Sequence, residues 1–186
     1  MSWKKLAAAL ACSVALLAGH ALVMAAPAET YPLKQGLHQW TAGTGKLMLV
    51  AGTYQDTTTF RRAYSFYFKE ANDDAWNQVP VPDKNKLPQF TWNSAVGGET
   101  TLADGIVAAR QDGIYFVVAD KRVERNKSYV DKGDIFVTWY KFTQAGDDHP
   151  DDPPYAFKPA FTRTYPKTAD TVDAILAREA SLQPRK

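Results

Sequence analysis

Few residues in this 186-residue chain have the types and spacing that metal binding requires. Beyond residue 25 the sequence holds two histidines, His38 and His149, far apart along the chain. A hydrolytic zinc site needs three protein ligands, usually at helical or short-loop spacing. The sequence contains no such cluster, so we expect no metal site and no cofactor.

His149 lies in the acidic segment 147–152, whose four aspartates carry the oxygen ligands that calcium prefers. Their spacing is not that of an EF-hand loop, Pro150 interrupts them, and Pro153-Pro154 ends the segment. Blocks of like charge are usually solvated. We therefore interpret the segment as an acidic surface turn.

Serine catalysis has no recognisable motif either. The mature chain contains neither a G-x-S-x-G elbow nor a Ser-x-x-Lys pair. Ser65 falls within a predicted strand, and Ser94 and Ser128 fall in predicted loops without a matching base. Residues 41–46 (TAGTGK) resemble a phosphate-binding loop only in composition, since they precede a strand where such a loop would open a helix. We predict a turn there, and no catalytic or cofactor-binding residue in the chain.

Aromatic residues are the most unusual feature. All nine Tyr, all nine Phe and four of the five Trp follow residue 25. Because neighbouring strand residues face opposite sides, about half of them should enter a core. We expect Tyr64 and Tyr67 to face opposite sides, and likewise Trp139 and Tyr140. Core packing is the favoured interpretation for most, and any that gather outside would form a recognition surface.

The elements that must position these residues are mainly short strands. Residues 26–44 are predicted to be a leader or first edge segment. Apolar or aromatic runs rich in strand-forming residues then follow at 46–51, 63–68, 76–81, 90–92, 105–110, 114–119, 135–142 (the longest), 155–157 and 161–165. This density of short strands predicts a mostly β fold, an antiparallel sandwich or barrel-like sheet.

Two local signals complete the predicted fold. Asp112-Gly113 separates two apolar runs and predicts a hairpin whose turn residues both have positive φ. One helix is predicted at the C-terminus, capped by Thr168 and favoured by acidic residues in its first turn. Its apolar stripe is predicted to consist of Val172, Ile175, Leu176 and Leu182, which would dock on the sheet.

The N-terminus has the pattern of a secretory signal peptide. Lys4 and Lys5 precede an apolar stretch over residues 6–25, and small residues at Ala25 and Ala28 offer two cleavage sites. The alternative is an uncleaved anchor, since about 20 apolar residues can span a bilayer. A lipoprotein signal ending at Cys12 is rejected, because its apolar segment would be too short. We predict a signal peptide over 1–25, one β-rich domain over 26–186, and a periplasmic or secreted protein.

Cleavage changes what the composition implies. It removes Cys12, the only cysteine, and two of the 22 basic residues, but none of the 20 acidic ones. The mature chain is therefore neutral and has no disulfide. Nucleic-acid binding needs a basic footprint, and membrane-surface binding needs a basic face, so neither partner is expected.

The order of elements resembles that of small periplasmic carbapenem self-resistance proteins of the CarG type. The likeness runs through the strands at 47–50, 64–68 and 76–81, and the strand that opens at Ala103-Asp104-Gly105. It continues through a basic loop, the aromatic strand at 136–142, the segment PPYAF at 153–157 and a helix that opens near DTVD at 170–173. That family also has an aspartate-rich turn and a cysteine pair, which this chain lacks, so no binding residue is carried over.

The resemblance implies protection against a carbapenem without hydrolysis, through binding a β-lactam ligand or its target. The competing hypothesis is a binding module or enzyme inhibitor. It would recognise a protein or glycan through exposed aromatics and the loop at 121–132, which carries five basic residues. Neither hypothesis makes the protein an enzyme, and the binding residues stay unassigned.

Overall fold

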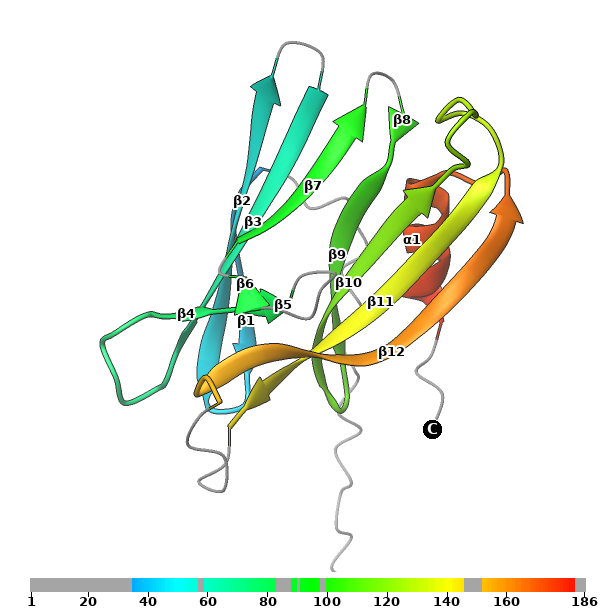
Figure 1. Cartoon of the computed structure of the whole chain (residues 1–186). Helices are drawn as coiled ribbons and strands as arrows, with labels where there is room; N and C mark the ends of the chain where they lie inside the picture. The colour runs from blue at the N-terminus through cyan, green and yellow to red at the C-terminus, as the bar shows by residue number, and fades with distance from the viewer. Residues whose placement is uncertain are drawn as a thin grey trace, which may run out of the picture.

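The chain folds into two antiparallel β-sheets and one helix (Figure 1). The structure is a computed structural model that describes residues 35–182, except 57–58, 83–87, 90, 98–99 and 146–151. The predicted signal peptide, Phe90, His149 and Asp147, Asp148 and Asp151 of the acidic segment lie outside the described residues.

The first sheet has the order β1-β2-β3-β7-β8, with the short β4 also paired to β3. Its strands are β1 Gly36–Ala42, β2 Gly45–Asp56, β3 Thr59–Lys69, β4 Asn77–Val79, β7 Thr91–Gly97 and β8 Thr100–Thr101. The second sheet has the order β12-β11-β10-β9. It comprises β9 Ala103–Arg110, β10 Gly113–Arg122, β11 Gly133–Gln144 and β12 Tyr155–Thr168. A small ribbon of β5 Val81–Pro82 and β6 Pro88–Gln89 accompanies them.

The predicted antiparallel sandwich is confirmed, since the inner faces of the two sheets share one core and neither sheet closes on itself. Aromatic rings dominate that core. The rings of Phe66 and Phe116 lie 4.9 Å apart, and those of Phe66 and Phe157 lie 4.7 Å apart. Full burial of each such side chain contributes about 1.5–3 kcal/mol, so an ordinary apolar core holds the sheets together without a disulfide.

Helix α1, Val172–Ser181, covers the outer face of the second sheet and makes a third layer (Figure 1). Val172, Ile175 and Leu176 are buried there against residues of β10 and β11 that include Trp139. The second sheet is therefore buried on both faces. This explains why residues 114–119 form an uninterrupted apolar run instead of an alternating one.

The predicted helix is confirmed, but its ends differ. Thr171 is the N-cap, and its hydroxyl accepts a hydrogen bond from the Ala174 amide at 3.2 Å. Thr168, the predicted cap, lies three residues before Thr171. Its hydroxyl accepts a hydrogen bond from the amide of Asp170. Leu182 lies past the helix and is 37% exposed, so it is not part of the buried stripe.

The strand predictions also need two corrections. The two predicted strands at 155–157 and 161–165 are one continuous strand, β12, which is longer than β11. The prolines at 159 and 166 are tolerated because β12 is an edge strand paired only to β11 along that segment, with a register shift opposite Tyr140. The predicted first edge segment is confirmed from Gly36 onward as the edge strand β1.

The hairpin at Asp112-Gly113 is confirmed, but its turn is different. Arg110 pairs with Gly113, so Gln111 and Asp112 form the turn and Gly113 begins β10. Gly113 has φ +143°, whereas Asp112 does not have a positive φ. The glycine therefore supplies the unusual backbone conformation alone.

Candidate binding site at the β1–β2 turn

Two hollows flank the turn that joins β1 to β2, at the opposite end of the sandwich from the basic loop. The inner hollow, of about 320 Å³, lies between this turn and the ends of β9, β10 and β11. The outer hollow, of about 550 Å³, lies beyond the same turn, beside the end of β3 and Trp76. Thr41 lines both hollows. Volumes of this size match those of small-molecule sites.

Glycines give the turn its shape. Gly43 has φ +59°, a left-handed conformation that residues with a Cβ rarely adopt. A Cβ on Gly45 would lie 2.4 Å from both the Lys69 carbonyl oxygen and the Phe68 ring, so a larger residue would push β2 away from β3. The segment 41–46 is a turn, as predicted. The sequence does not predict that this turn lies between two hollows.

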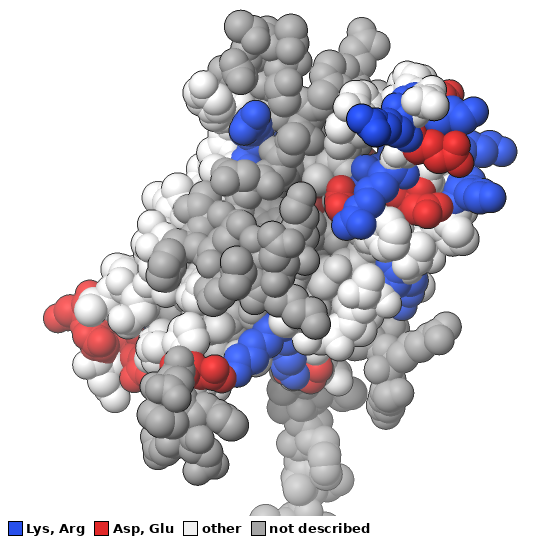
Figure 2. Space-filling model, viewed as in Figure 1, with Lys and Arg blue, Asp and Glu red and all other residues white. Residues whose placement is uncertain are grey.

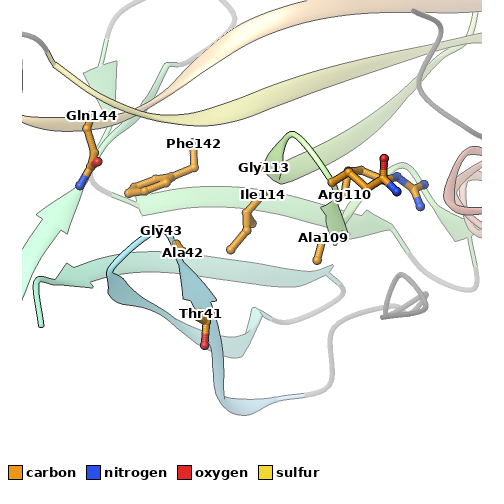
Figure 3. A pocket seen from close by; sticks show the side chains of 10 residues that line it. Thr41, Ala42, Gly43, Ala109, Arg110, Gly113, Ile114, Phe142 and Gln144 are labelled. Carbon is orange, nitrogen blue, oxygen red and sulfur yellow. The ribbon is translucent and has the colours of Figure 1, made fainter. Parts of the chain in front are cut away.

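The inner hollow is mainly apolar and neutral, and Arg110 is the one charged residue of its lining. Phe142 and Ile114 face Ala42 and Gly43 across it (Figure 3). Arg110 also borders it, but its side chain extends away, and its guanidinium donates to the Ala180 carbonyl at 2.8 Å. The inner hollow therefore offers an apolar wall with a few neutral polar groups at its rim.

A hydrogen-bond cluster holds the β9–β10 turn at the edge of the inner hollow. The Tyr115 hydroxyl donates to Asp112 at 2.5 Å, and the Lys141 ammonium lies 3.3 Å from the same carboxylate. The hydrogen bond from Tyr115, followed by Lys141, lowers the pKa of Asp112. Burial and Asp112 together raise the pKa of Tyr115 to about 12.

The outer hollow is cationic and aromatic. Thr41 pairs with Lys46, and Lys46 pairs with Lys69, so these three residues form one row across β1, β2 and β3. Lys69 contacts Asp74 at 3.1 Å, and the Asp74 side chain is fully exposed. Trp76 closes the hollow on the side of the β3–β4 loop and is 38% exposed.

Glu70 lines the outer hollow too, but its carboxylate is engaged. The Tyr155 hydroxyl on β12 donates to it, which ties the β3–β4 loop to the second sheet. This hydrogen bond is the main reason that the pKa of Tyr155 is raised to about 12. The rim of the hollow is thus anchored to both sheets.

Two buried carboxylates elsewhere have structural partners. Asp104 on β9, 1% exposed, lies 2.7 Å from the Arg62 guanidinium and accepts from the Tyr64 hydroxyl and the Gly105 amide. Burial raises the pKa of Asp104, and burial and Asp104 raise that of Tyr64. Because Arg62 and Tyr64 belong to β3, this cluster joins the first sheet to the second.

The neighbouring Gly105 is required for packing. A Cβ at this position would lie 2.6 Å from the Phe116 ring in the core between the sheets. The segment Ala103-Asp104-Gly105, which carries part of the family resemblance, thus has a structural role.

Glu179 on α1 is fully buried on the other side of the second sheet. It accepts from Trp139 Nε1 at 2.9 Å, from Arg163 at 2.6 Å and from the Tyr165 hydroxyl at 2.5 Å. These three donors satisfy both carboxylate oxygens and fix the helix on the sheet.

The candidate residues from the sequence do not come together. His38 lies on β1 with its ring stacked on Trp40 at 6.0 Å, and it lines neither hollow. Ser65 lies within β3, as predicted, whereas Ser94 lies within β7 and not in the predicted loop, because its segment pairs with β3. The Ser128 amide donates to Asp131 in the β10–β11 loop. Over the described residues no group of three His, Cys, Asp or Glu is placed to hold a metal ion.

The expectations about aromatic side chains are partly confirmed. Tyr64 enters the core between the sheets, and Tyr67 pairs with Met48 on the outer face of the first sheet. Trp139 and Tyr140 do face opposite sides, but both are buried because α1 covers the outer side. Trp76 at the outer hollow and Tyr129 in the basic loop remain exposed.

The basic loop between β10 and β11 contains charges of both signs, which gather over one end of the second sheet (Figure 2). Arg122 contacts Asp120 at 3.1 Å and covers the Phe136 ring at 4.6 Å, whereas Lys121 is buried. At the tip, Tyr129 and Val130 are 56% and 71% exposed. This loop is a mixed surface rather than a purely basic one.

Comparison with known proteins gives one informative match. The crystal structure of CarG superposes with a TM-score of 0.64 over 83% of this chain and 96% of that chain, at 21% sequence identity. The likeness is one of fold. It confirms the structural resemblance that the order of elements predicted. No protein-family model matches the chain, and no curated protein does.

The described part of the chain contains no helix of the length and apolarity that a membrane span needs.

Proposed function

We propose that this protein is exported and protects its cell against a carbapenem by binding the drug rather than hydrolysing it. The observation that carries the proposal is the fold shared with CarG over most of both chains. The signal-peptide pattern at residues 1–25 supports export.

The chemistry of the two hollows supports binding without catalysis. A carbapenem is a compact bicyclic compound with one carboxylate, and its hydrolysis needs an activated nucleophile or a metal-bound water. The described residues that line the hollows include no histidine, cysteine or serine. They include apolar side chains, side-chain amides, threonine hydroxyls and two lysines, which suit recognition of an anionic ring compound. The other two charged residues of the lining, Arg110 and Glu70, have hydrogen-bond partners within the protein.

Susceptibility of a bacterial host tests protection. Expression of the full chain in a carbapenem-susceptible Gram-negative strain should raise the inhibitory concentration of the drug. Expression without residues 1–25 should leave it unchanged, because the protein would then stay in the cytoplasm. Equal susceptibility of the strain expressing the full chain and the empty strain would contradict the proposal.

Two measurements on the purified mature protein separate binding from hydrolysis. The ultraviolet absorbance of the drug should persist at substoichiometric protein. The melting temperature should rise by about 5–10 °C when the drug is at a hundred times its Kd. Catalytic loss of drug absorbance would show an enzyme instead.

The second candidate is a module that recognises another protein through the β10–β11 loop. The exposed Tyr129 and Val130 at the tip favour it, since aromatics often anchor interfaces. A pull-down from envelope extract would test it. A partner retained by the native chain and lost by Tyr129→Ala would support this function over drug binding.

A further inference from the structure

The arrangement of the outer hollow carries an inference about ligand class. Lys46 and Lys69 are directly opposite one another on neighbouring antiparallel strands. Such opposite residues have Cβ atoms about 4.5–5.5 Å apart, and like charges at this spacing are destabilising. Both lysines line the same hollow. An anion between them would remove the repulsion.

The surroundings of the two lysines show how an anion would be held. Within the part of the chain that the structure describes, no carboxylate lies within ion-pair distance of Lys46. Lys69 already holds the Asp74 carboxylate at 3.1 Å, although that carboxylate is fully exposed. An exposed pair contributes little, so a ligand carboxylate can displace it. Asp74 thus occupies one half of an anion site.

Trp76 supplies the second kind of contact. Its indole is 38% exposed and borders the same hollow as the lysines. An exposed indole offers a flat apolar face for a ring, and Gln39 and Thr44 add neutral hydrogen-bonding groups. The hollow therefore combines two cations, an aromatic face and neutral polar groups. Glu70 is the one acid in its lining, and its carboxylate is hydrogen-bonded by the Tyr155 hydroxyl.

We propose that the outer hollow is a subsite for a ring compound with one carboxylate, which lies between Lys46 and Lys69 while the ring packs on Trp76. For the drug itself this assignment rests on the function proposed above. An acidic sugar such as glucuronic acid has the same chemistry, and the experiment distinguishes the two sources.

Direct calorimetric titration of the mature protein tests the subsite with matched pairs of probes. One pair is a carbapenem and the ester of its carboxylate, and the other is glucuronic acid and glucose. In at least one pair, the acid should bind about tenfold more tightly than its neutral partner, or better. The reason is that hydrogen bonds to charged groups are stronger than those between neutral groups. The affinity should fall as NaCl is raised.

Variants assign the binding to the hollow. Lys46→Gln and Lys69→Gln should each weaken binding of the acid about tenfold. Asp74→Asn should strengthen it by freeing Lys69, and Trp76→Ala should weaken acid and neutral probes alike. Lys132→Gln in the distant loop serves as the control and should bind as the native chain does. Melting temperatures at or above the native value would show that the lysine variants are folded.

The outcomes separate the two proposals. Binding of glucuronic acid but not of the carbapenem, with the expected lysine dependence, would support the subsite and count against the protective function. Drug binding that is unchanged in Lys46→Gln and Lys69→Gln would overturn the subsite and leave the protective function standing. Failure of both acids to bind would also overturn the subsite.

Discussion

The two outer faces of the sandwich differ in what covers them. On the second sheet, α1 buries Trp139 and places Glu179 among three donors. On the first sheet no described element covers the row of Gln39, Met48 and Tyr67 or the neighbouring row that ends at Lys69. Leu37 on this face is 67% exposed.

This difference indicates that the two outer faces have different roles. The covered face is apolar with one buried, fully satisfied acid, so its side chains serve stability. The uncovered face ends in two adjacent cations beside an exposed indole, and the ion pair of Lys69 with the exposed Asp74 contributes little to stability. This is therefore the face on which recognition of a ligand is to be sought.

The largest expected loss of stability comes from a substitution on the covered face. Glu179→Ala removes the acceptor of three hydrogen bonds and leaves the Arg163 guanidinium without its carboxylate. Arg163 is 30% exposed, so water partly solvates the charge left behind, and the buried Trp139 indole also loses its acceptor. We expect a loss of about 3 kcal/mol of unfolding free energy, the lower end of the range for a broken buried pair. Urea denaturation followed by circular dichroism measures it. Glu124→Ala, at an exposed site, is the control, and equal midpoints for the two variants would contradict the role of Glu179.

A smaller effect is expected at the start of the helix. Thr171→Ala removes the N-cap hydrogen bond to Ala174 and should cost about 1 kcal/mol. Thr168→Ala removes only a local bond to the Asp170 amide and should cost less. The same denaturation experiment compares the two. A larger loss for Thr168→Ala would place the cap where the sequence pattern puts it.

On the uncovered face a substitution should stabilise. Lys46→Gln relieves the repulsion with Lys69 and should raise the unfolding free energy by about 0.2–1 kcal/mol at low salt. The gain should shrink as salt screens the charges. A loss of stability at low salt would show that the two lysines do not repel one another in the folded protein.

The smallest effect on stability at neutral pH is expected at the rim of the outer hollow. Glu70→Gln should move the pKa of Tyr155 from about 12 towards its ordinary value of 10.0. Because the folded pKa is the higher one, the stability from this hydrogen bond is present below pH 10 and is lost as the pH rises through 12. Tyrosinate absorbance at alkaline pH, with Tyr155→Phe as the blank, measures the shift. Identical titrations of native and Glu70→Gln proteins would contradict the contact.

Local patterns predicted most of the elements, because short-range physics sets them. Alternating and aromatic runs predicted the strands, and Gly113 predicted the hairpin through its need for an unusual φ. The sequence pattern predicts two strands where the structure has the single strand β12, because the run is interrupted around Pro159. Only the pairing shows that Pro159 lies on an edge strand, where it is tolerated. Periodicity predicts Leu182 on the apolar stripe of the helix, but it does not indicate that the helix ends at Ser181.

The candidate site could not be predicted in the same way. Lys46, Lys69 and Trp76 are spread over some thirty residues and form no motif. Only the register of β2 with β3 makes the two lysines neighbours, and only the β3–β4 loop brings Trp76 to them. The one available signal was the glycine-rich turn at 41–46, which lies between the hollows.

The sequence by itself determined the mostly β architecture, the C-terminal helix and the absence of any cysteine beyond Cys12, because periodicity, capping and composition act locally. The tertiary structure alone decided which face α1 covers, which carboxylates are buried and which cations meet. Those properties depend on strand pairings and on side-chain contacts between segments far apart in the chain, such as the hydrogen bond from Tyr64 on β3 to Asp104 on β9. Such pairings are selected by the packing of the whole core and not by any local pattern.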